Sequence, residues 1–165
     1  VIYKYGEERA SRRIAKTIVN TRVENPIITT RQLADLVCRV IPSRKNGKRN
    51  RDIHPATKTF QALRIYINRE LEEIKEVLPQ AVDVLCSGGR LVAISFHSLE
   101  DRIVKRFMRD QSTPKTYPPE LPIMPDSSGI QLKIIGKKIR ATKAEIDKNT
   151  RSRSATLRIA ERCSS

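Results

Sequence analysis

A histidine, a serine and two carboxylates follow directly on an apolar run within residues 88–102 (GGRLVAISFHSLEDR). The run itself, residues 91–96, predicts a short strand buried on both faces, as in a parallel sheet. Ser98 stands where the N-cap of a following helix belongs, and acidic residues occupy the first turn after it. In open α/β sheets, ligands bind outside the carboxyl ends of the strands, where helices begin. His97 and Ser98 are therefore candidate binding residues.

Simpler structural roles compete with a binding role at this turn. Ser98 could merely cap the helix, and His97 could merely satisfy a backbone carbonyl; for either residue taken alone, this is the favoured interpretation. A hydrolase triad of Ser98, His97 and a neighbouring carboxylate is excluded. Triad members converge from separate elements, whereas these residues are neighbours in sequence.

Arginines near the end of the chain form a second candidate site. Residues 149–154 (NTRSRS) place Arg151 and Arg153 just before a predicted last strand, residues 155–161 (ATLRIAE). Strand alternation would point both guanidiniums to the same side, where they suit phosphate or carboxylate. An exposed basic loop explains them equally well. A solvated loop and a phosphate contact are likewise both open for the basic segment at residues 43–52 (SRKNGKRNRD).

The charge of the chain indicates a polyanionic partner. Its 165 residues contain 33 Lys or Arg and 18 Asp or Glu, a formal net charge of +15. Nucleic acid is favoured over a merely solvated surface, and over a membrane surface, since no basic helix has one strongly apolar face. Aromatic residues make up 4% of the chain, which disfavours an RNA platform of stacked rings. No apolar run approaches the roughly 20 residues that span a bilayer, so no membrane segment is expected.

Cysteines and glycines limit the cofactors that this sequence can hold. Cys38, Cys86 and Cys163 are odd in number and far apart, so neither a zinc site nor a disulfide framework is expected. They are interpreted as reduced thiols of a cytoplasmic protein. None of the six glycines has GxGxxG or GxxxxGK spacing after a strand. We therefore expect no metal ligands and no cofactor-binding residues within this chain.

The order of the predicted elements places these candidates in an α/β fold. The first part is helical: a helix over 7–22 that ends at Asn25, a helix capped by Thr29 or Thr30, and a long helix from His54 that is broken or restarted at Pro79. A strand over 91–96, a helix over 99–109 and an irregular excursion over 112–129 follow. The chain then continues with a strand over 131–135, a short helix opened by Thr142 with capping-box spacing, and a strand over 155–161.

Four segments together resemble one known family. They are residues 5–8 (YGEE) with the arginine-rich stretch that follows, residues 54–64 (HPATKTFQALR), residues 88–108 (GGRLVAISFHSLEDRIVKRFM) and residues 151–161 (RSRSATLRIAE). In order and extent they are similar to the 16S ribosomal RNA cytosine-N4 methyltransferases, also called the MraW or RsmH family. The third segment is long and specific, and the resemblance covers essentially the whole chain. One departure is Asn149-Thr150, where the family usually has Asn-Pro.

The resemblance implies a Rossmann-like S-adenosylmethionine methyltransferase fold that is interrupted by a helical insertion. Residues 1–53 would be the later part of the insertion, and residues 54–165 the C-terminal half of the methyltransferase domain, with an antiparallel final strand. The family's glycine-rich cofactor loop, its acidic residue after the second strand and its loop for the target amine would all precede Val1. The chain is therefore expected to be a fragment that is inactive alone.

The activity implied for the whole bacterial enzyme is N4-methylation of a cytidine in the decoding region of 16S ribosomal RNA, with the small ribosomal subunit as partner. The matched segments supply six candidate substrate-binding residues: His97, Ser98, Arg64, Arg102, Arg151 and Arg153. The first two would border the base pocket, and the arginines would position RNA or support the pocket wall. Two alternatives stay open: a stand-alone basic module that binds RNA or the ribosome without catalysis, and an assembly fragment whose charge is incidental.

Overall fold

The computed structural model of the protein describes residues 1–41, 54–114 and 129–164. These residues form two compact units, Val1–Glu70 and Leu71–Ser165. The predicted basic segment at 43–52 and residues 115–128 of the predicted excursion at 112–129 lie outside the described residues. Within the described ranges, no helix is both long and apolar enough to cross a membrane.

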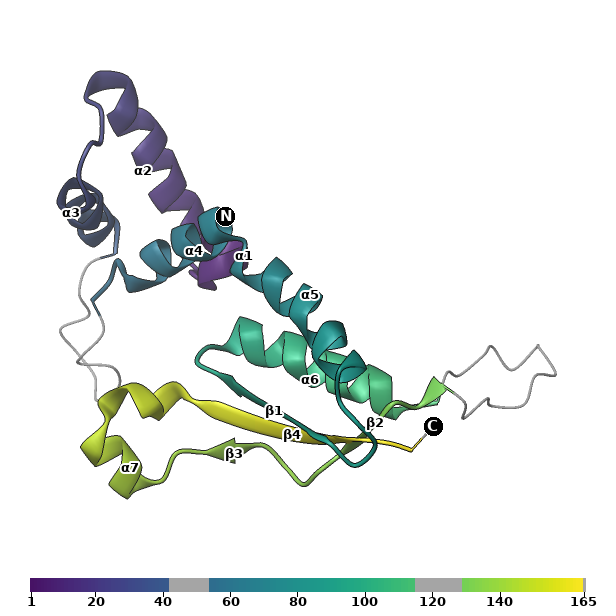
Figure 1. Ribbon diagram of the computed structural model, residues 1–165. Helices are drawn as coiled ribbons and strands as arrows, with labels where there is room; N and C mark the ends of the chain where they lie inside the picture. The colour runs from purple at the N-terminus through teal and green to yellow at the C-terminus, as the bar shows by residue number, and fades with distance from the viewer. Residues whose placement is uncertain (42–53, 115–128, 165) are drawn as a thin grey trace, which may run out of the picture. The chain divides into compact units, whose positions relative to one another are not determined.

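The first unit is helical (Figure 1). Its helices are α1 (Ile2–Gly6), α2 (Ser11–Glu24), α3 (Thr30–Val40) and α4 (Thr57–Asn68). The helix expected over 7–22 is thus preceded by a separate one, because Glu7 has a left-handed backbone with a φ of 48° that ends α1. Ile14, Val37 and Ala56 are fully buried and form the centre of this unit.

Two helix ends in this unit lie where the sequence predicted them. Thr29 caps α3: its Oγ1 accepts a hydrogen bond from the Gln32 amide at 3.2 Å, and Gln32 Oε1 accepts one from the Thr29 amide at 3.0 Å. This reciprocal pair is a capping box, which satisfies two backbone donors at once. Asn25 is the C-cap of α2, which confirms the predicted end of that helix.

Close packing of α1 on α4 depends on a glycine in the YGEE segment. A Cβ atom at Gly6 would lie 2.6 Å from the Lys58 carbonyl oxygen and 3.3 Å from the Ala62 Cβ. Lys58 Nζ also donates a hydrogen bond to the Glu7 carbonyl, at 3.2 Å. Part of the YGEE segment therefore has a structural role, which is to seat α1 on α4.

The long helix predicted from His54 is two helices, α4 and α5 (Glu70–Asp83). The break lies at Arg69, whose left-handed φ of 55° ends α4. The prediction that Pro79 breaks or restarts the helix is wrong, since Pro79 lies inside α5. A proline inside a helix removes one backbone hydrogen bond, but the neighbouring Leu78 and Val82 are buried in the core and hold α5 in place.

The second unit contains an antiparallel sheet with the last strand at its centre (Figure 1). Its strands are β1 (Arg90–Ser95), β2 (Leu132–Ile134), β3 (Ile139–Arg140) and β4 (Thr156–Arg162). One edge of β4 pairs with β1, from Glu161 opposite Arg90 to Thr156 opposite Ser95. The other edge pairs with β2 and β3. The three predicted strands and the antiparallel final strand are confirmed, and β3 is an additional short strand.

Two helices cover one face of this sheet. α5 and α6 (Ser98–Ser112) contribute to a core of six buried residues: Leu78, Val82, Val104, Met108, Leu132 and Ala160. On the other face Val92 is 53% exposed and Ile94 is 57% exposed. The prediction that β1 is buried on both faces of a parallel sheet is therefore wrong for the described residues. A wholly apolar strand does not reveal its pairing direction, because that depends on partners far away in the sequence.

Short elements lead from β3 back into β4. α7 (Lys143–Lys148) begins at Thr142, whose Oγ1 accepts a hydrogen bond from the Glu145 amide at 3.3 Å, so the predicted cap is confirmed. The 3₁₀ helix η2 (Thr150–Ser154) follows and ends directly before β4.

Candidate functional site

At the carboxyl end of β1, a histidine opens α6. His97 is the N-cap, and its Nδ1 accepts a hydrogen bond from the Glu100 amide at 3.4 Å. Glu100 Oε2 in turn accepts hydrogen bonds from the amides of Phe96 and His97, at 2.8 and 3.3 Å. The prediction that Ser98 is the N-cap is wrong: Ser98 is the first helical residue, and the imidazole of the preceding extended residue reaches the free helix amide instead.

The same capping box controls the charge of Glu100. Burial opposes its negative charge most strongly, but the His97 ring and the amides of Phe96 and His97 together outweigh burial, so the pKa of Glu100 lies below its ordinary value. The imidazole Nε2 lies 3.1 Å from Glu100 Oε1. This buried nitrogen has no aligned hydrogen-bond partner in the part of the chain that the structure describes. His97 thus caps α6 through Nδ1, while its Nε2 atom makes no hydrogen bond among the described residues.

An ion pair one residue further along ties α6 to the central strand. Arg158 Nε and Nη2 donate to the two carboxylate oxygens of Asp101, at 2.7 and 3.0 Å. Hydrogen bonds from Arg158 hold the pKa of Asp101 below its usual value; partial burial opposes them, and the charges of Arg158, Lys138 and Lys105 lower this pKa further. Sequence analysis missed this pair, because contacts between distant elements leave no local pattern.

Arg151 and Arg153 lie just before the last strand, as predicted, but in the 3₁₀ helix η2 rather than in an extended segment. A 3₁₀ helix repeats about every three residues, so side chains two positions apart do not share a direction. The prediction that both guanidiniums point the same way is therefore wrong. Both residues are exposed, and Ser152 between them is buried with its Oγ donating to the Asn149 carbonyl at 2.8 Å.

The His97 turn and η2 nevertheless lie at the same end of the sheet. Ser95, the last residue of β1, is opposite Thr156, the first residue of β4. The His97 turn follows Ser95 and η2 ends one residue before β4, so both lie at this end of the sheet (Figure 1). Five of the six predicted residues therefore belong to elements that begin or end at this end of the unit: His97, Ser98, Arg102, Arg151 and Arg153.

Arg64, the sixth predicted residue, belongs to α4 in the first unit. Its Nε and Nη2 donate to the Glu70 carboxylate at 2.8 and 3.1 Å. Asn68 Nδ2 donates to the same carboxylate at 3.3 Å. Both partners belong to the first unit, so these bonds hold the end of α4 to the residue that follows Arg69 and give Arg64 a structural role.

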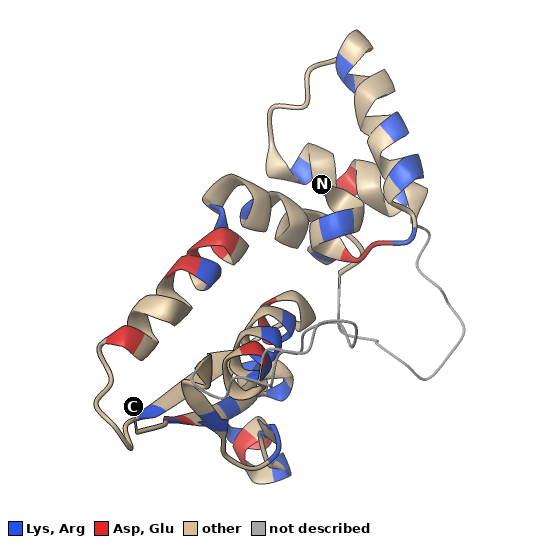
Figure 2. Ribbon diagram, turned by 90° about the vertical axis from the view of Figure 1, so that its right-hand side faces the viewer, with Lys and Arg blue, Asp and Glu red and all other residues tan. Residues whose placement is uncertain are grey.

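Positive charge is concentrated in particular elements (Figure 2). α2 carries four Lys or Arg and one acidic residue, and residues 130–165 carry ten Lys or Arg and three acidic residues. α5 has the opposite character, with five acidic residues and one lysine. Coulomb attraction therefore favours polyanion contacts on α2 and on the C-terminal segment, and disfavours them on α5.

The three cysteines have free thiols. Cys38 Sγ lies 3.7 Å from His54 Nε2, a weak contact within the first unit. Cys86 is exposed and Cys163 is half-buried.

Taken together, the fold and this strand end define an α/β protein with a strongly basic surface. Residues 1–163 match the MraW methylase family, and the chain belongs to this family. It is 53% identical over 164 residues to the ribosomal RNA small subunit methyltransferase H of Coxiella burnetii, with 99% of this chain and 52% of that protein covered. The proteins of the same name from Nitrosomonas eutropha and Thioalkalivibrio sulfidiphilus are 52% and 51% identical, with 98% of this chain and 52% and 50% of those proteins covered. The chain thus spans about half the length of the curated relatives it matches, and the family resemblance inferred from the sequence is confirmed.

Proposed function

We propose that this chain is the C-terminal half of an enzyme that transfers a methyl group from S-adenosylmethionine to the N4 atom of a cytidine in the decoding region of 16S ribosomal RNA. The observation that carries the proposal is the family match over residues 1–163. Relatives named ribosomal RNA small subunit methyltransferase H, of which the chain covers about half, support it. The division at residue 53 into an insertion and a methyltransferase domain, and a cytoplasmic location, belong to the same proposal.

An uncovered sheet face supports the assignment as half of a domain. Val92, Ile94 and Ile139 are 53%, 57% and 53% exposed, and they share this face with half-buried Leu157 and Ile159. Contiguous apolar surface is unfavourable in water and marks an interaction site. Among the described strands, β1 pairs with β4 alone. In a doubly wound fold, further strands would continue the sheet from β1, and helices would cover the exposed face.

In this proposal the described residues of this chain supply no complete cofactor site. The glycine pair at Gly88-Gly89 lies before β1, at the opposite end from His97, where the Gly88 amide donates to the Arg162 carbonyl at 2.9 Å. Gly88 has a φ of 76°, and the Gly89 amide donates to the Cys86 carbonyl at 2.9 Å, so this pair forms the turn that leads from α5 into β1. Cofactor loops of α/β folds lie at the carboxyl ends of strands instead. The missing half would therefore have to hold S-adenosylmethionine, which supplies the methyl group.

The residues of this chain would act on the RNA. The target base has to be unpaired or flipped out of a helix for its N4 atom to be reached. Contacts to the flanking phosphates would fix its position without reading sequence. We assign the border of the base pocket to His97 and Ser98, and either RNA positioning or support of the pocket wall to the four predicted arginines: Arg64, Arg102, Arg151 and Arg153.

Calorimetry with S-adenosylmethionine tests this proposal. We expect a clear binding heat with the complete protein and none with the chain of residues 1–165, which should be inactive alone. Heat from this chain alone that matches the heat from the complete protein would contradict the half-domain assignment.

A stand-alone RNA-binding module is the second candidate, and the ten basic residues within 130–165 favour it. If the complete protein bound small-subunit RNA in a steeply salt-dependent manner but gave no heat with S-adenosylmethionine, this second candidate would replace the first.

A further inference from the structure

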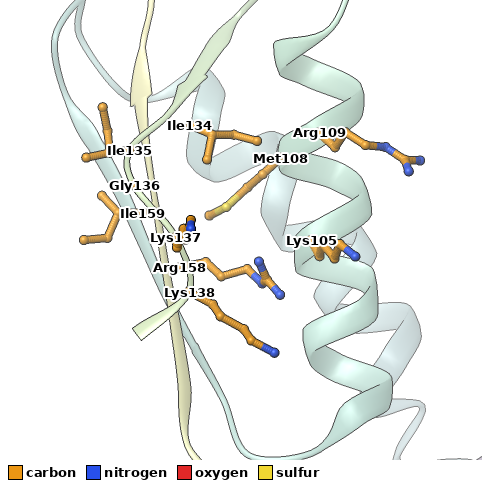
Figure 3. Close-up of a pocket in the computed structure, with 10 residues that line it drawn as sticks. All are labelled: Lys105, Met108, Arg109, Ile134, Ile135, Gly136, Lys137, Lys138, Arg158 and Ile159. Atoms are coloured by element: carbon orange, nitrogen blue, oxygen red, sulfur yellow. The ribbon is translucent and has the colours of Figure 1, made fainter. Parts of the chain in front are cut away.

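The second unit contains a cavity of about 220 Å³ (Figure 3). None of the residues that line it belongs to the His97 turn. It lies between α6 and the segment that joins β2 to β3. Met108 from α6 and Ile134 from β2 point into it, whereas the side chains of Ile135 and Ile159 point away and contribute mainly backbone (Figure 3). Met108 is 2% exposed and Ile134 is 46% exposed, so the cavity has an apolar floor that is partly open to solvent.

A rim of positive charge surrounds this floor from two sides. Lys105 and Arg109 lie one turn apart on α6, and Lys137 and Lys138 follow Gly136 on the opposite segment. Gly136 has a left-handed φ of 67°, and a Cβ there would meet no atom within 4 Å. The turn conformation, rather than lack of space, therefore requires glycine at the position that presents the two lysines.

Little negative charge balances this rim. Asp101 is bound on both carboxylate oxygens by Arg158, which also lines the cavity. The charges of Lys105 and Lys138 also lower the pKa of Asp101, so the negative charge of this one carboxylate is shared among three cations. Arg109 contacts Asp110 at 3.1 Å, but both side chains are more than 60% exposed, at 61% and 64%. Exposed pairs of this kind bind weakly and are easily replaced by another anion.

We propose that this cavity binds one unpaired nucleotide of the substrate RNA, at a place distinct from the methylated base. Its base would lie against Met108 and Ile134, and its flanking phosphates would contact the lysines on the two sides. The proposal deepens the proposed function, because the RNA concerned is the substrate of that function. The cavity would then act as an anchor that fixes the RNA relative to the active site.

The size and chemistry of the cavity fit a single base. It is smaller than the roughly 300–1,000 Å³ pockets that enclose drug-sized ligands, and a single aromatic ring is a suitable occupant. The Met108 sulfur favours contact with an aromatic ring, and guanidinium planes such as that of Arg158 are common neighbours of unpaired bases. Phosphates on either side of the base match cations on both sides of the floor.

Nucleic acid fits these features better than an acidic peptide does. The surrounding segment, residues 130–165, carries ten basic and three acidic residues, so attraction to a long polyanion extends well beyond the cavity. An acidic peptide would need carboxylates only at the rim, which leaves the apolar floor and the wider basic surface without a partner.

A pair of double variants of the complete protein tests the proposal. Lys137→Ala/Lys138→Ala removes two charges at the cavity, and Lys143→Ala/Lys148→Ala removes two exposed charges from α7 in the same unit. Affinity for a single-stranded RNA oligonucleotide and for a blunt RNA duplex of the same sequence would be measured by fluorescence anisotropy at several salt concentrations, without S-adenosylmethionine.

The cavity variant should bind the single strand about ten-fold more weakly, with a salt slope lowered by about one for each lysine lost. The α7 variant should lose less than about three-fold. Ile134→Ser should weaken binding of the single strand more than binding of the duplex, and 4-thiouridine in the single strand should cross-link to the wild-type protein at β2 or α6.

Equal losses in the two double variants, or cross-links that all map outside the second unit, would overturn the proposal. So would an acidic peptide whose binding depends on Lys137 and Lys138 while RNA binding does not. Methyl transfer by the wild-type protein, measured in parallel, distinguishes failure of the proposed function from failure of the cavity proposal. Absence of methyl transfer contradicts the proposed function, whereas the RNA affinities test the cavity without any cofactor.

Discussion

Arg158 on the central strand and Asp101 in the first turn of α6 share two charge-assisted hydrogen bonds, at 2.7 and 3.0 Å. Both side chains are largely shielded from solvent, at 18% and 22% exposed. The pair holds the start of α6 against the sheet, next to the His97 cap. It also fixes the guanidinium at the edge of the RNA-binding cavity proposed above, so one contact supports both places where this chain would meet RNA.

Loss of this pair should destabilise the second unit. Asp101→Asn leaves Arg158 without its carboxylate and is expected to cost ~1–3 kcal/mol in the free energy of unfolding, measured with urea. Glu161→Gln is the matched control, because Glu161 contacts Arg90 at 3.5 Å and that arginine is 65% exposed. The control should cost less than ~0.5 kcal/mol. Similar losses in both variants would show that the Arg158–Asp101 pair contributes no more than a surface contact.

Acid should destabilise the protein through Glu100 and Asp101. Both pKa values are lowered in the folded state, from ordinary values of 4.5 and 3.8, so the unfolded chain takes up protons more readily than the folded one. Their stabilising contribution is present above about pH 4.5 and is lost as the pH falls through the lowered pKa values. The free energy of unfolding should therefore drop more steeply below pH 4.5 in the wild type than in Glu100→Gln/Asp101→Asn. Parallel pH profiles for the two proteins would contradict this assignment.

Gly6 should tolerate no side chain. Gly6→Ala would put a Cβ 2.6 Å from the Lys58 carbonyl oxygen, so α1 would have to move away from α4. The expected cost is ~1–3 kcal/mol in the stability of the first unit, measured by chemical denaturation. Gly129→Ala is the control, since a Cβ there meets no atom within 4 Å. Equal stability of the two variants would mean that α1 does not need this close approach.

Local patterns in the sequence predicted most elements but few of the contacts between them. The caps at Thr29 and Thr142 and the strands β1, β2 and β4 follow from short-range residue preferences. β3 has two residues, which is too short for any alternation to show. Asp101 and Arg158 are 57 residues apart, and only the sheet register brings them together.

The sequence predicts where the candidate site lies, but not which side chains make its hydrogen bonds. The strand-to-helix turn at residues 96–98 was correctly placed at the carboxyl end of β1. Hydroxyl side chains are common at N-caps, so the sequence favours Ser98 as the N-cap of α6. In the structure the His97 imidazole takes that role. The basic rim of the cavity combines α6 with the segment after β2, so no single stretch of sequence contains it.

Two substitutions separate the capping role of His97 from a role in RNA binding. His97→Asn keeps an N-cap acceptor, whereas His97→Ala removes it and should cost ~0.5–2 kcal/mol in stability. If His97 borders the base pocket, methylation by the complete protein should fall at least about ten-fold (~1.4 kcal/mol in the activation barrier) in both variants. Full activity in His97→Asn, with near wild-type stability, would leave His97 with a capping role only.

The exposed sheet face should respond differently in the chain alone and in the complete protein. Val92→Thr/Ile94→Thr replaces two side chains that are 53% and 57% exposed in this structure. In the chain of residues 1–165 the change should leave stability within ~0.5 kcal/mol and reduce aggregation. In the complete protein it should cost ~1–3 kcal/mol, because other elements would bury both residues. Equal effects in the two proteins would contradict the half-domain assignment.

Methylation of the small ribosomal subunit tests the central claim most directly. The complete protein would be incubated with S-adenosylmethionine and subunits that lack the modification, and the nucleosides of the 16S ribosomal RNA would be separated and identified by mass spectrometry. We expect N4-methylcytidine at one position in the decoding region, and none when the chain of residues 1–165 replaces the complete protein. No methyl transfer by the complete protein, or transfer to a different base or atom, would contradict the account.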